Sequence, residues 1–328
     1  MDSLVDPARI PQRILSVPDD VQDYILKRRT KPLQGEPIMI TGSPRSGTTM
    51  LAELFNNGRL IYYHEPFIRK SSFWSMHPDS YKDGAPADMA HVQHIWSEML
   101  SQRAWSHYRK TDSKYPYITK GAMHRLFGFP KRRIVVKDPS LSYWMDMFMR
   151  ISGPVKPVFL FRDPRAIVSS LLRLNWDPGE RLAHVFNQTL FKHFALAFAQ
   201  ERRSGLMSLS PLQRMSIQTA ILHASMRRQI AHIPKAAVVH FEHLVREPAA
   251  QLSALSQEID LPSDFFDPRR TKAILAAKHQ VYNRHQYQRD ATAHVHIWDS
   301  NMSKKDIQVT MELYHRVNPP YSHSTHEA

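Results

Sequence analysis

The chain contains no cysteine among its 328 residues. Disulfide bonds, thiolate metal sites and cysteine nucleophiles are therefore excluded. No apolar run approaches the about 20 residues that a membrane-spanning helix needs, and residues 1–30 lack the apolar core of a signal peptide. We therefore expect a soluble, cytoplasmic protein without a transmembrane segment.

Negative charge is scarce relative to positive charge. The chain has 44 Lys and Arg against 30 Asp and Glu, which gives a formal net charge of +14. Such a balance favours polyanionic partners: nucleic acid, an anionic membrane face or a phosphorylated small molecule. The basic residues are spread along the chain and form no long tail, so we expect no nucleic-acid partner. The oligomeric state stays open.

Short apolar runs predict a parallel sheet. Buried strands are expected at residues 37–41, 133–137, 157–161 and 237–241, with a possible fifth at 60–63. Helical patterns follow most of them, at 47–57, 164–174 and 247–259, and residues 181–232 are predicted to be mostly helical. The alternation indicates an α/β doubly wound parallel sheet of the P-loop-like kind, flanked by helices.

We expect one domain over residues 1–328, since a hydrophobic content of 42% suffices for a full core. Its core covers about residues 36–262. Residues 71–129 are rich in aromatics, glycine and proline and show weak periodicity, which indicates an insertion over the sheet edge. Insertions of this kind commonly shape substrate pockets.

Residues 38–51 form the most informative stretch of the chain. A buried strand leads through a loop bounded by Gly42 and Gly47 into a helix. Successive backbone NH groups of such a loop, together with the helix dipole, hold an anion. The spacing resembles the nucleotide-triphosphate loop G-x-x-x-x-G-K-[ST], but Thr48 stands at the lysine position and the nearest cation is Arg45. The loop therefore indicates a different phosphorylated ligand or a different reaction.

Polar residues follow the other predicted strands. His64 and Glu65 follow the possible fifth strand, Lys137 ends another strand, and Arg162 follows a third. In an open parallel sheet, ligands bind beyond the carboxyl ends of the strands. We therefore expect a carboxylate, several cations and the anion-binding loop to share one site.

These motifs resemble the sulfotransferases that depend on 3′-phosphoadenosine 5′-phosphosulfate (PAPS). In that superfamily a loop P-[KR]-S-G-[TS]-[TS] binds the 5′-phosphosulfate, and a strand followed by R-[DN]-P, with a serine eight residues after the arginine, binds the 3′-phosphate. The second motif is matched by Arg162 and Ser170, and an aromatic-E-D-L segment by residues 241–244, with His243 in place of the aspartate. The loop is matched by Pro44, Arg45, Ser46, Gly47, Thr48 and Thr49.

The Arg45 variant and the Glu65-Pro66 pair are similar to the carbohydrate and bacterial branch of the superfamily. The resemblance covers about residues 38–261, and Trp298 is a weaker match to a C-terminal segment, about 280–328, that would cover the cofactor. It implies PAPS as sulfuryl donor, no metal, and a hydroxyl acceptor on a carbohydrate, lipid or secondary metabolite.

The resemblance also implies roles for individual residues. Arg45 and Lys137 would stabilise the bridging oxygen and the leaving phosphate, while Thr48 and Thr49 donate to the 5′-phosphate. Glu65 would accept the acceptor's proton, because carbohydrate-type members place a carboxylate there. His64 is the competing base.

Two other functions stay open at this point. A P-loop kinase or hydrolase would need a cation in place of Thr48 and would use Asp138 as its Mg²⁺ partner. A basic nucleic-acid-binding protein would use the loop for phosphates. The missing lysine counts against the first, and the joint presence of Arg162 and Ser170 favours the sulfotransferase interpretation over another nucleotide loop.

Several side chains also have a purely structural interpretation. Glu65 could pair with Arg69 four residues on, and Lys137 could form a surface ion pair. Residues 131–133 are predicted to be a solvated basic loop, and a metal site at His294 and His296 is rejected because such pairs arise easily among 19 histidines. Two interpretations stay open for each of the remaining residues. Trp74, Trp96 and Trp105 could stack on a sugar or pack in the core, and Arg284 and Arg289 could bind the 3′-phosphate or lie at the surface.

Overall fold

The computed structural model describes residues 34–57, 59–69, 81–82, 85–86, 89–100, 133–179, 182, 192–276 and 295–320. Most of the predicted insertion lies outside these ranges. The alternatives stated for Trp74, Trp105, Arg284, Arg289 and His294 also concern residues outside them.

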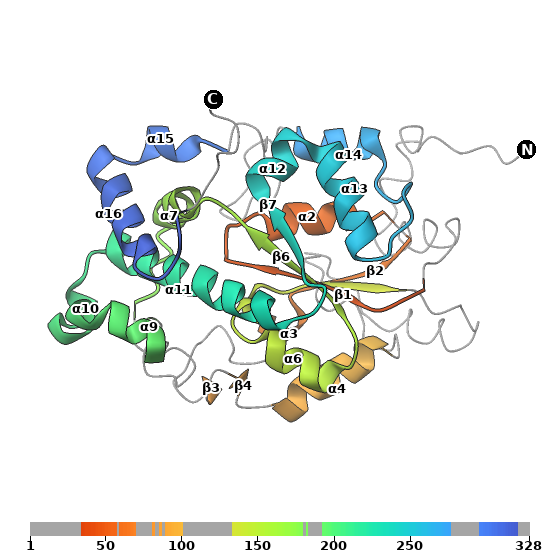
Figure 1. Ribbon diagram of the computed structural model, residues 1–328, viewed down its shortest axis with the longest axis horizontal. Helices are drawn as coiled ribbons and strands as arrows, with labels where there is room; N and C mark the ends of the chain where they lie inside the picture. The colour runs from red at the N-terminus through yellow and green to blue at the C-terminus, as the bar shows by residue number, and fades with distance from the viewer. Residues whose placement is uncertain are drawn as a thin grey trace, which may run out of the picture.

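A five-stranded parallel sheet forms the centre of the molecule (Figure 1), in the order β2-β5-β1-β6-β7. Its strands are β1 (Ile38–Gly42), β2 (Ile61–His64), β5 (Ile134–Lys137), β6 (Lys156–Phe161) and β7 (Ala237–His240). All five predicted strands are thereby confirmed. Strand β2 begins and ends one residue later than predicted, so His64 is a strand residue, in register with Lys137 of β5. A short antiparallel pair, β3 (Tyr81–Lys82) and β4 (Ala85–Pro86), lies apart from this sheet.

Helices alternate with the strands, as the sequence predicts. The helices α2 (Thr48–Phe55), α7 (Pro164–Arg173) and α13 (Pro248–Glu258) lie within the predicted helical ranges. The others that precede the last strand are α3 (Pro66–Arg69), α4 (Met89–Leu100), η4 (Pro139–Ser142), α6 (Met145–Ser152), α9 (Lys192–Ala197), α10 (Ala199–Ser204), η6 (Leu206–Ser208) and α11 (Pro211–His232). After β7 come α12 (Phe241–Arg246), α14 (Pro268–Leu275), α15 (Ile297–Asn301) and α16 (Lys304–His315).

The predicted helical segment 181–232 is divided into separate helices. A glycine with positive φ, Gly205, precedes η6, and the last and longest piece, α11, starts at Ser210 and Pro211. The Ser210 side chain accepts from Gln213 N, and the Gln213 side chain accepts from Ser210 N, which forms a capping box. The division therefore has local causes in the sequence.

Two hydrophobic layers enclose the sheet. Helices α2, α12, α13 and α14 cover one face, and α3, α4, α6 and α11 cover the other (Figure 1). The first layer contains Leu51, Phe55 and Leu252, and the second contains Trp144 and Phe148. Because both faces are covered, the strands are almost continuously apolar, as is typical of parallel sheets.

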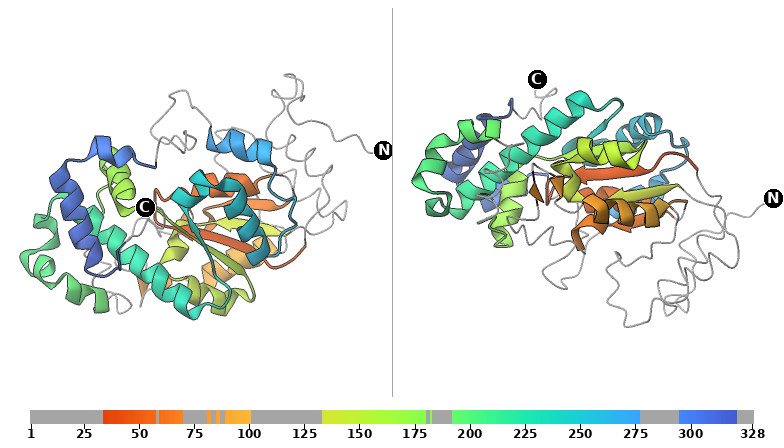
Figure 2. Two further views of the ribbon diagram at one scale, coloured as in Figure 1. Left: turned by 45° about the horizontal axis from the view of Figure 1, so that its top comes forward. Right: turned by 90° about the horizontal axis from the view of Figure 1, so that it is seen from below.

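The C-terminal helices pack at one end of the molecule. Figures 1 and 2 place α15 and α16 beside α7, α9 and α10. Helix α16 is joined to α11 by the pair His223 Nδ1 and Tyr314 Oη, 3.0 Å apart, and by the Ser216 hydroxyl, which donates to Thr310 Oγ1 over 3.2 Å. Within the described ranges, no helix is both long and apolar enough to span a bilayer.

The prediction of a solvated basic loop at residues 131–133 is wrong for Arg133. Its side chain is buried, 3% exposed, at the start of β5. The guanidinium donates to the carbonyl oxygens of Ile259, Asp260 and Glu36, at 2.8, 3.0 and 2.5 Å. A basic residue can be buried where carbonyl groups satisfy its donors, and here it joins the chain before β1 to the end of α13.

Candidate functional site

The loop between β1 and α2 has the geometry of an anion-binding loop. Ser46 N donates to Ser43 O over 3.0 Å, and Arg45 and Gly47 have positive φ angles of 70° and 101°. A Cβ atom on Gly47 would lie 2.6 Å from the Phe241 ring, so glycine is required there. Backbone NH groups of such a left-handed turn at a helix start are suited to an anion.

The hydroxyl groups of the loop support this interpretation. Ser43 Oγ and Ser46 Oγ are buried and make no hydrogen bond within the described part of the chain. Thr48, buried, is the first residue of α2, and Thr49 follows it in the first turn, half-buried. A buried hydroxyl without a partner is costly, and an oxyanion in the loop would remove that cost. The residues present therefore fit a phosphate or phosphosulfate group.

The predicted second phosphate site lies beside the loop. Arg162 follows β6, and its Nη1 donates to Arg45 O over 2.9 Å. The Arg45 Nε donates to the Ser170 hydroxyl over 3.0 Å. The guanidinium of Arg162 also lies over the Phe241 ring, 4.4 Å from its centroid, which fixes its plane. The structure thus brings Arg45, Arg162 and Ser170 together, as the sequence predicts.

Glu65 and Lys137 form an ion pair on the other side of the loop. Lys137 Nζ donates to Glu65 Oε1, and Glu65 N donates to Lys137 O over 2.7 Å. The lysine side chain is 3% exposed and that of Glu65 is 24% exposed, so this is no surface pair. Glu65 has a positive φ of 51°, a conformation that a non-glycine residue adopts at some cost. His64 Nε2 lies 3.6 Å from Glu65 Oε1.

Asp138 is a buried carboxyl group next to the Glu65–Lys137 pair. It is 0% exposed and follows Lys137 directly. Its oxygens accept hydrogen bonds from Phe67 N at 2.9 Å, Ser140 N at 3.0 Å and the Ser140 hydroxyl at 2.7 Å. Its own backbone oxygen accepts from the Thr41 hydroxyl over 3.0 Å, at the end of β1. Asp138 thus ties the start of α3, just after Glu65, to the strand that carries the loop.

Burial dominates the titration of Asp138. Desolvation raises the pKa of its carboxyl to about 7, the nearby Glu65 carboxylate adds to the rise, and the hydrogen bonds from Ser140 and Phe67 N oppose it. Both carboxylate oxygens are engaged inside the protein, where a Mg²⁺ ligand would have to face the loop. This arrangement gives no support to Asp138 as a metal partner.

Contacts of Asp163 and Arg165 hold the Arg162 turn in place. Asp163 caps α7 by accepting from Arg165 N, while Asp163 N donates to Glu242 Oε1 over 2.9 Å. The Arg165 guanidinium binds the Asp163 carboxylate and lies 3.7 Å from the centroid of the Trp298 ring. Helix α15 is thereby attached to the start of α7. The Arg-Asp-Pro-Arg sequence is a signal for the first contact, but nothing in the sequence indicates the Trp298 stack.

Trp96 is a core residue. It is 3% exposed, its ring meets that of Phe148 edge-on at 5.1 Å, and its indole NH donates to Ser152 O. Core packing, the second of the two stated interpretations, therefore holds for this tryptophan. Within the described ranges, no group of three or more His, Asp or Glu could hold a metal ion.

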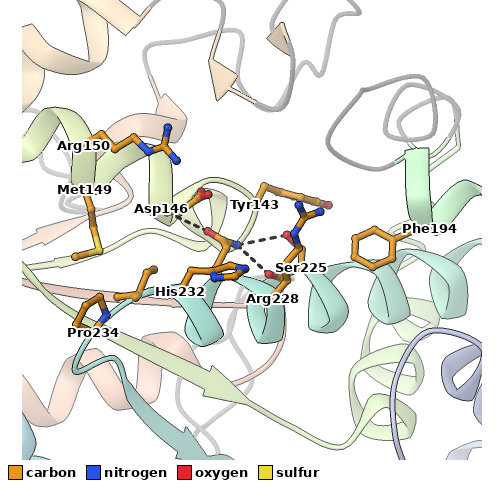
Figure 3. A pocket seen from close by; sticks show the side chains of 11 residues that line it. Tyr143, Asp146, Met149, Arg150, Phe194, Ser225, Arg228, His232 and Pro234 are labelled. Carbon is orange, nitrogen blue, oxygen red and sulfur yellow. Dashed lines mark hydrogen bonds between the residues drawn. The ribbon is translucent and has the colours of Figure 1, made fainter.

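A separate hollow of about 450 Å³ lies between α6 and α11 (Figure 3). Its walls include Asp146, Arg150, Arg228 and His232, and none of the predicted site residues. Among its lining residues, Gln229 donates from Nε2 to Ser142 O over 2.7 Å, and its Oε1 accepts from Asp146 N. This hollow is distinct from the candidate site at the loop.

Solved structures similar to the chain include the sulfotransferase STF9 from Mycobacterium avium, with 13% identity, TM-score 0.42, and coverage of 90% of this chain and 79% of that one. The sulfotransferase domain from the curacin biosynthetic pathway has 14% identity and TM-score 0.40, with coverage of 86% and 98%. A sulfotransferase from Alicyclobacillus acidocaldarius has 15% identity and TM-score 0.34, with coverage of 87% and 97%.

No curated protein matches the sequence. The family model described as "Sulfotransferase family", however, matches residues 37–267. The matched range includes the loop, Glu65, Lys137, Arg162 and Ser170. Because this match covers more than half of the chain, the protein belongs to the sulfotransferase family.

Proposed function

We propose that the protein transfers the sulfuryl group of PAPS to a hydroxyl group of a carbohydrate, lipid or secondary metabolite. The observation that supports this most is the arrangement around β1. The loop after β1 contains the buried Ser46 hydroxyl, which has no hydrogen-bond partner among the described residues. The neighbouring strand β6 leads to the cluster of Arg162 and Ser170, and the neighbour on the other side, β5, ends at the Lys137–Glu65 pair.

Donor binding is assigned to the loop and to the Arg162 turn. In this proposal the NH groups around Gly47 and the hydroxyls of Ser46, Thr48 and Thr49 bind the 5′-phosphosulfate. Arg162 and Ser170 bind the 3′-phosphate. Bound PAPS supplies the sulfuryl group, and the proposal assigns no metal.

The C-terminal segment is assigned to the 3′-phosphate end of the donor. The stack of Trp298 on Arg165 supports this, because Arg165 lies three residues after Arg162 and both belong to the same turn. We propose that residues 280–328 cover the donor in part through α15.

The transfer step needs alignment and compensation of charge on the departing phosphate, by analogy with loose phosphoryl transfer. Glu65 accepts the proton of the acceptor hydroxyl. At the same time the acceptor oxygen bonds to sulfur, and the bond from sulfur to the bridging phosphate oxygen breaks. Lys137 and Arg45 carry positive charge toward the leaving phosphate. The products are a sulfate ester and adenosine 3′,5′-bisphosphate. His64, beside Glu65, is the other candidate base.

A titration tests the donor assignment. Adenosine 3′,5′-bisphosphate and ATP-Mg²⁺ are compared by calorimetry and by thermal shift. A ligand at about 100 times its dissociation constant stabilises the folded protein by about 2.7 kcal/mol, which is measurable. Binding of the bisphosphate without binding of ATP-Mg²⁺ is expected. Binding of ATP-Mg²⁺ alone would favour a P-loop kinase or hydrolase, and steep salt dependence without bisphosphate binding would favour a nucleic-acid-binding protein.

Two variants test the individual roles. Arg162→Ala is expected to remove the preference for the bisphosphate over AMP, and unchanged affinities for both would contradict the assignment. Glu65→Gln is expected to keep bisphosphate binding and to lower sulfate transfer from PAPS about 10²-fold or more, the contribution of a general base. Transfer is measured with radiolabelled sulfate in PAPS against a panel of glycan, lipid and small-molecule acceptors.

A further inference from the structure

The Tyr62 hydroxyl contacts the histidine that lies beside Glu65. Tyr62 Oη lies 2.6 Å from His64 Nδ1, and the other ring nitrogen, Nε2, lies 3.6 Å from Glu65 Oε1. The first distance is a short hydrogen bond. The second is too long for a hydrogen bond but is a close electrostatic contact, and catalytic contacts are often long until the substrate is bound.

The two rings meet because of strand geometry. Residues two apart in a strand point to the same face, and Tyr62 and His64 occupy β2 in this relation. Both side chains are largely buried, with residue exposures of 8% each, and their rings meet edge-on at 81°. Tyr62 belongs to the hydrophobic cluster that also contains Leu51 of α2, so its ring position is fixed by packing.

This contact selects one form of the neutral imidazole when the tyrosine hydroxyl is the donor. A neutral histidine carries its proton on one ring nitrogen, and the hydrogen bond made by the other nitrogen determines which. A tyrosine hydroxyl that donates to Nδ1 leaves the proton on Nε2. Nε2 then presents an N–H group to the Glu65 carboxylate, which is an acceptor when ionised. The opposite tautomer would turn a lone pair toward that carboxylate.

We infer that Tyr62 is a positioning residue for sulfuryl transfer: it holds His64 in the Nε2–H tautomer, and His64 in turn orients Glu65. This inference rests on the proposed function, since it takes Glu65 as the base. With Nδ1 bonded to Tyr62 and Nε2–H directed at Glu65, His64 is a donor to the base and not a base itself. Lys137 Nζ and His64 Nε2 thus approach the same oxygen, Oε1, from two strands.

The tautomer can be measured without any substrate. Long-range ¹H–¹⁵N spectra of protein labelled at the imidazole nitrogens distinguish the two neutral tautomers. The His64 signals are identified among those of the 19 histidines by their loss in His64→Gln. The Nε2–H form is expected in the wild-type protein, and Tyr62→Phe is expected to convert part of it to the other tautomer. The Nδ1–H form in the wild type, or spectra unchanged by Tyr62→Phe, would overturn the inference.

Kinetics test whether the tautomer matters. Tyr62→Phe removes one hydrogen bond and is expected to lower kcat about three- to tenfold, with no more than about a twofold change in bisphosphate affinity. His64→Gln keeps an N–H group where Nε2–H lies, so we expect it to retain transfer within about tenfold of wild type. If His64 were the base, His64→Gln would instead lose as much activity as Glu65→Gln.

A double-mutant cycle then separates positioning from general packing. If Tyr62 acts through His64, the loss caused by Tyr62→Phe disappears in the His64→Gln background. An undiminished loss in that background would contradict the inference. Tyr63→Phe is the matched control, because Tyr63 lies one residue along β2 on the opposite face, in the other hydrophobic cluster. It should change neither kcat nor the His64 spectrum.

These results are distinguishable from a failure of the proposed function. If the wild-type protein binds no bisphosphate, the donor assignment fails whatever the His64 spectrum shows. If it binds the bisphosphate and transfers sulfate but Tyr62→Phe has the kcat of the wild type, the positioning role of Tyr62 fails and the proposed function stands.

Discussion

Arg45 Nε donates a hydrogen bond to the Ser170 hydroxyl over 3.0 Å, although the two residues lie 125 positions apart in the chain. The loop after β1 and the helix after β6 are thereby joined at the point where both predicted phosphate sites meet. The Arg45 side chain is directed toward Ser170, on the side of the loop that faces the Arg162 turn, while the Lys137–Glu65 pair lies on the other side of the loop.

We expect Ser170→Ala to weaken binding of adenosine 3′,5′-bisphosphate by about ten- to a hundredfold, since one hydrogen bond to a charged group is worth about 1.5–3 kcal/mol. Affinity for AMP should change much less, because AMP lacks the 3′-phosphate. Both affinities are measured by calorimetry. The control is Ser169→Ala, which truncates the adjacent buried serine of α7. Equal losses for both nucleotides would remove Ser170 from the 3′-phosphate site.

Gly47→Ala should abolish bisphosphate binding and lower the free energy of unfolding. Its Cβ would lie 2.6 Å from the Phe241 ring, and alanine is strained at a φ of 101°. Gly205→Ala separates the backbone strain from the steric clash, because Gly205 has a φ of 88° with nothing within 4 Å of the added Cβ. Urea unfolding should show a loss of about 1 kcal/mol for Gly205→Ala and a larger loss for Gly47→Ala. Similar losses would mean that the Phe241 ring moves aside.

His223→Asn should reduce the loss of stability in acid. Burial, with smaller contributions from Arg227 and His240, lowers the pKa of His223 to about 3, so the folded protein keeps this imidazole neutral. The unfolded chain takes up the proton below about pH 6.5, and stability therefore falls as the pH drops from about 6.5 toward 3. Urea unfolding at pH 7 and pH 5 measures the difference. From pH 7 to pH 5, the free energy of unfolding of His223→Asn should fall less than that of the wild type. His232→Asn, at an exposed position, should behave as wild type.

Asp138→Asn should remove a loss of stability that the wild type shows as the pH rises. Desolvation raises the pKa of Asp138 to about 7, so the folded state holds a proton that the unfolded chain releases at about pH 4. The contribution of Asp138 to the free energy of unfolding is therefore full below about pH 4 and decreases as the pH rises through about 7. Relative to the variant, the wild type should become less stable from pH 5 to pH 8. If the difference in free energy of unfolding between wild type and variant stays constant from pH 5 to pH 8, the Asp138 carboxyl is ionised throughout this range.

The strands and the loop could be predicted because each depends on local signals. Short apolar runs are typical of buried parallel strands, and the glycines at 42 and 47 mark the loop between strand and helix. The positions of Arg162 and Ser170 follow from the same argument, since side chains after parallel strands meet at one edge. Their hydrogen bonds to Arg45 could not be derived, because they depend on how β6 and α7 are placed beside β1.

Arg133 shows why the rest was out of reach. A run of three basic residues favours solvent, and no pattern indicates which of them finds carbonyl acceptors from segments 97 and 126 positions away. Tyr62 was missed for a related reason: an aromatic residue in a buried strand is expected to be a core residue, which it is. The spacing of Tyr62 and His64 on one strand face was the available signal.

The central place of β1 in the strand order β2-β5-β1-β6-β7 divides the chain into two parts with different freedom to vary. The segments after β6 and β7 meet the side of the loop that faces Arg162, whereas the segment between β2 and β5 starts from Glu65 and leads into the strand that ends at Lys137. Under the proposed function, the long stretch from 66 to 133 can be exchanged between related proteins to suit new acceptors while every residue assigned to the donor stays in place.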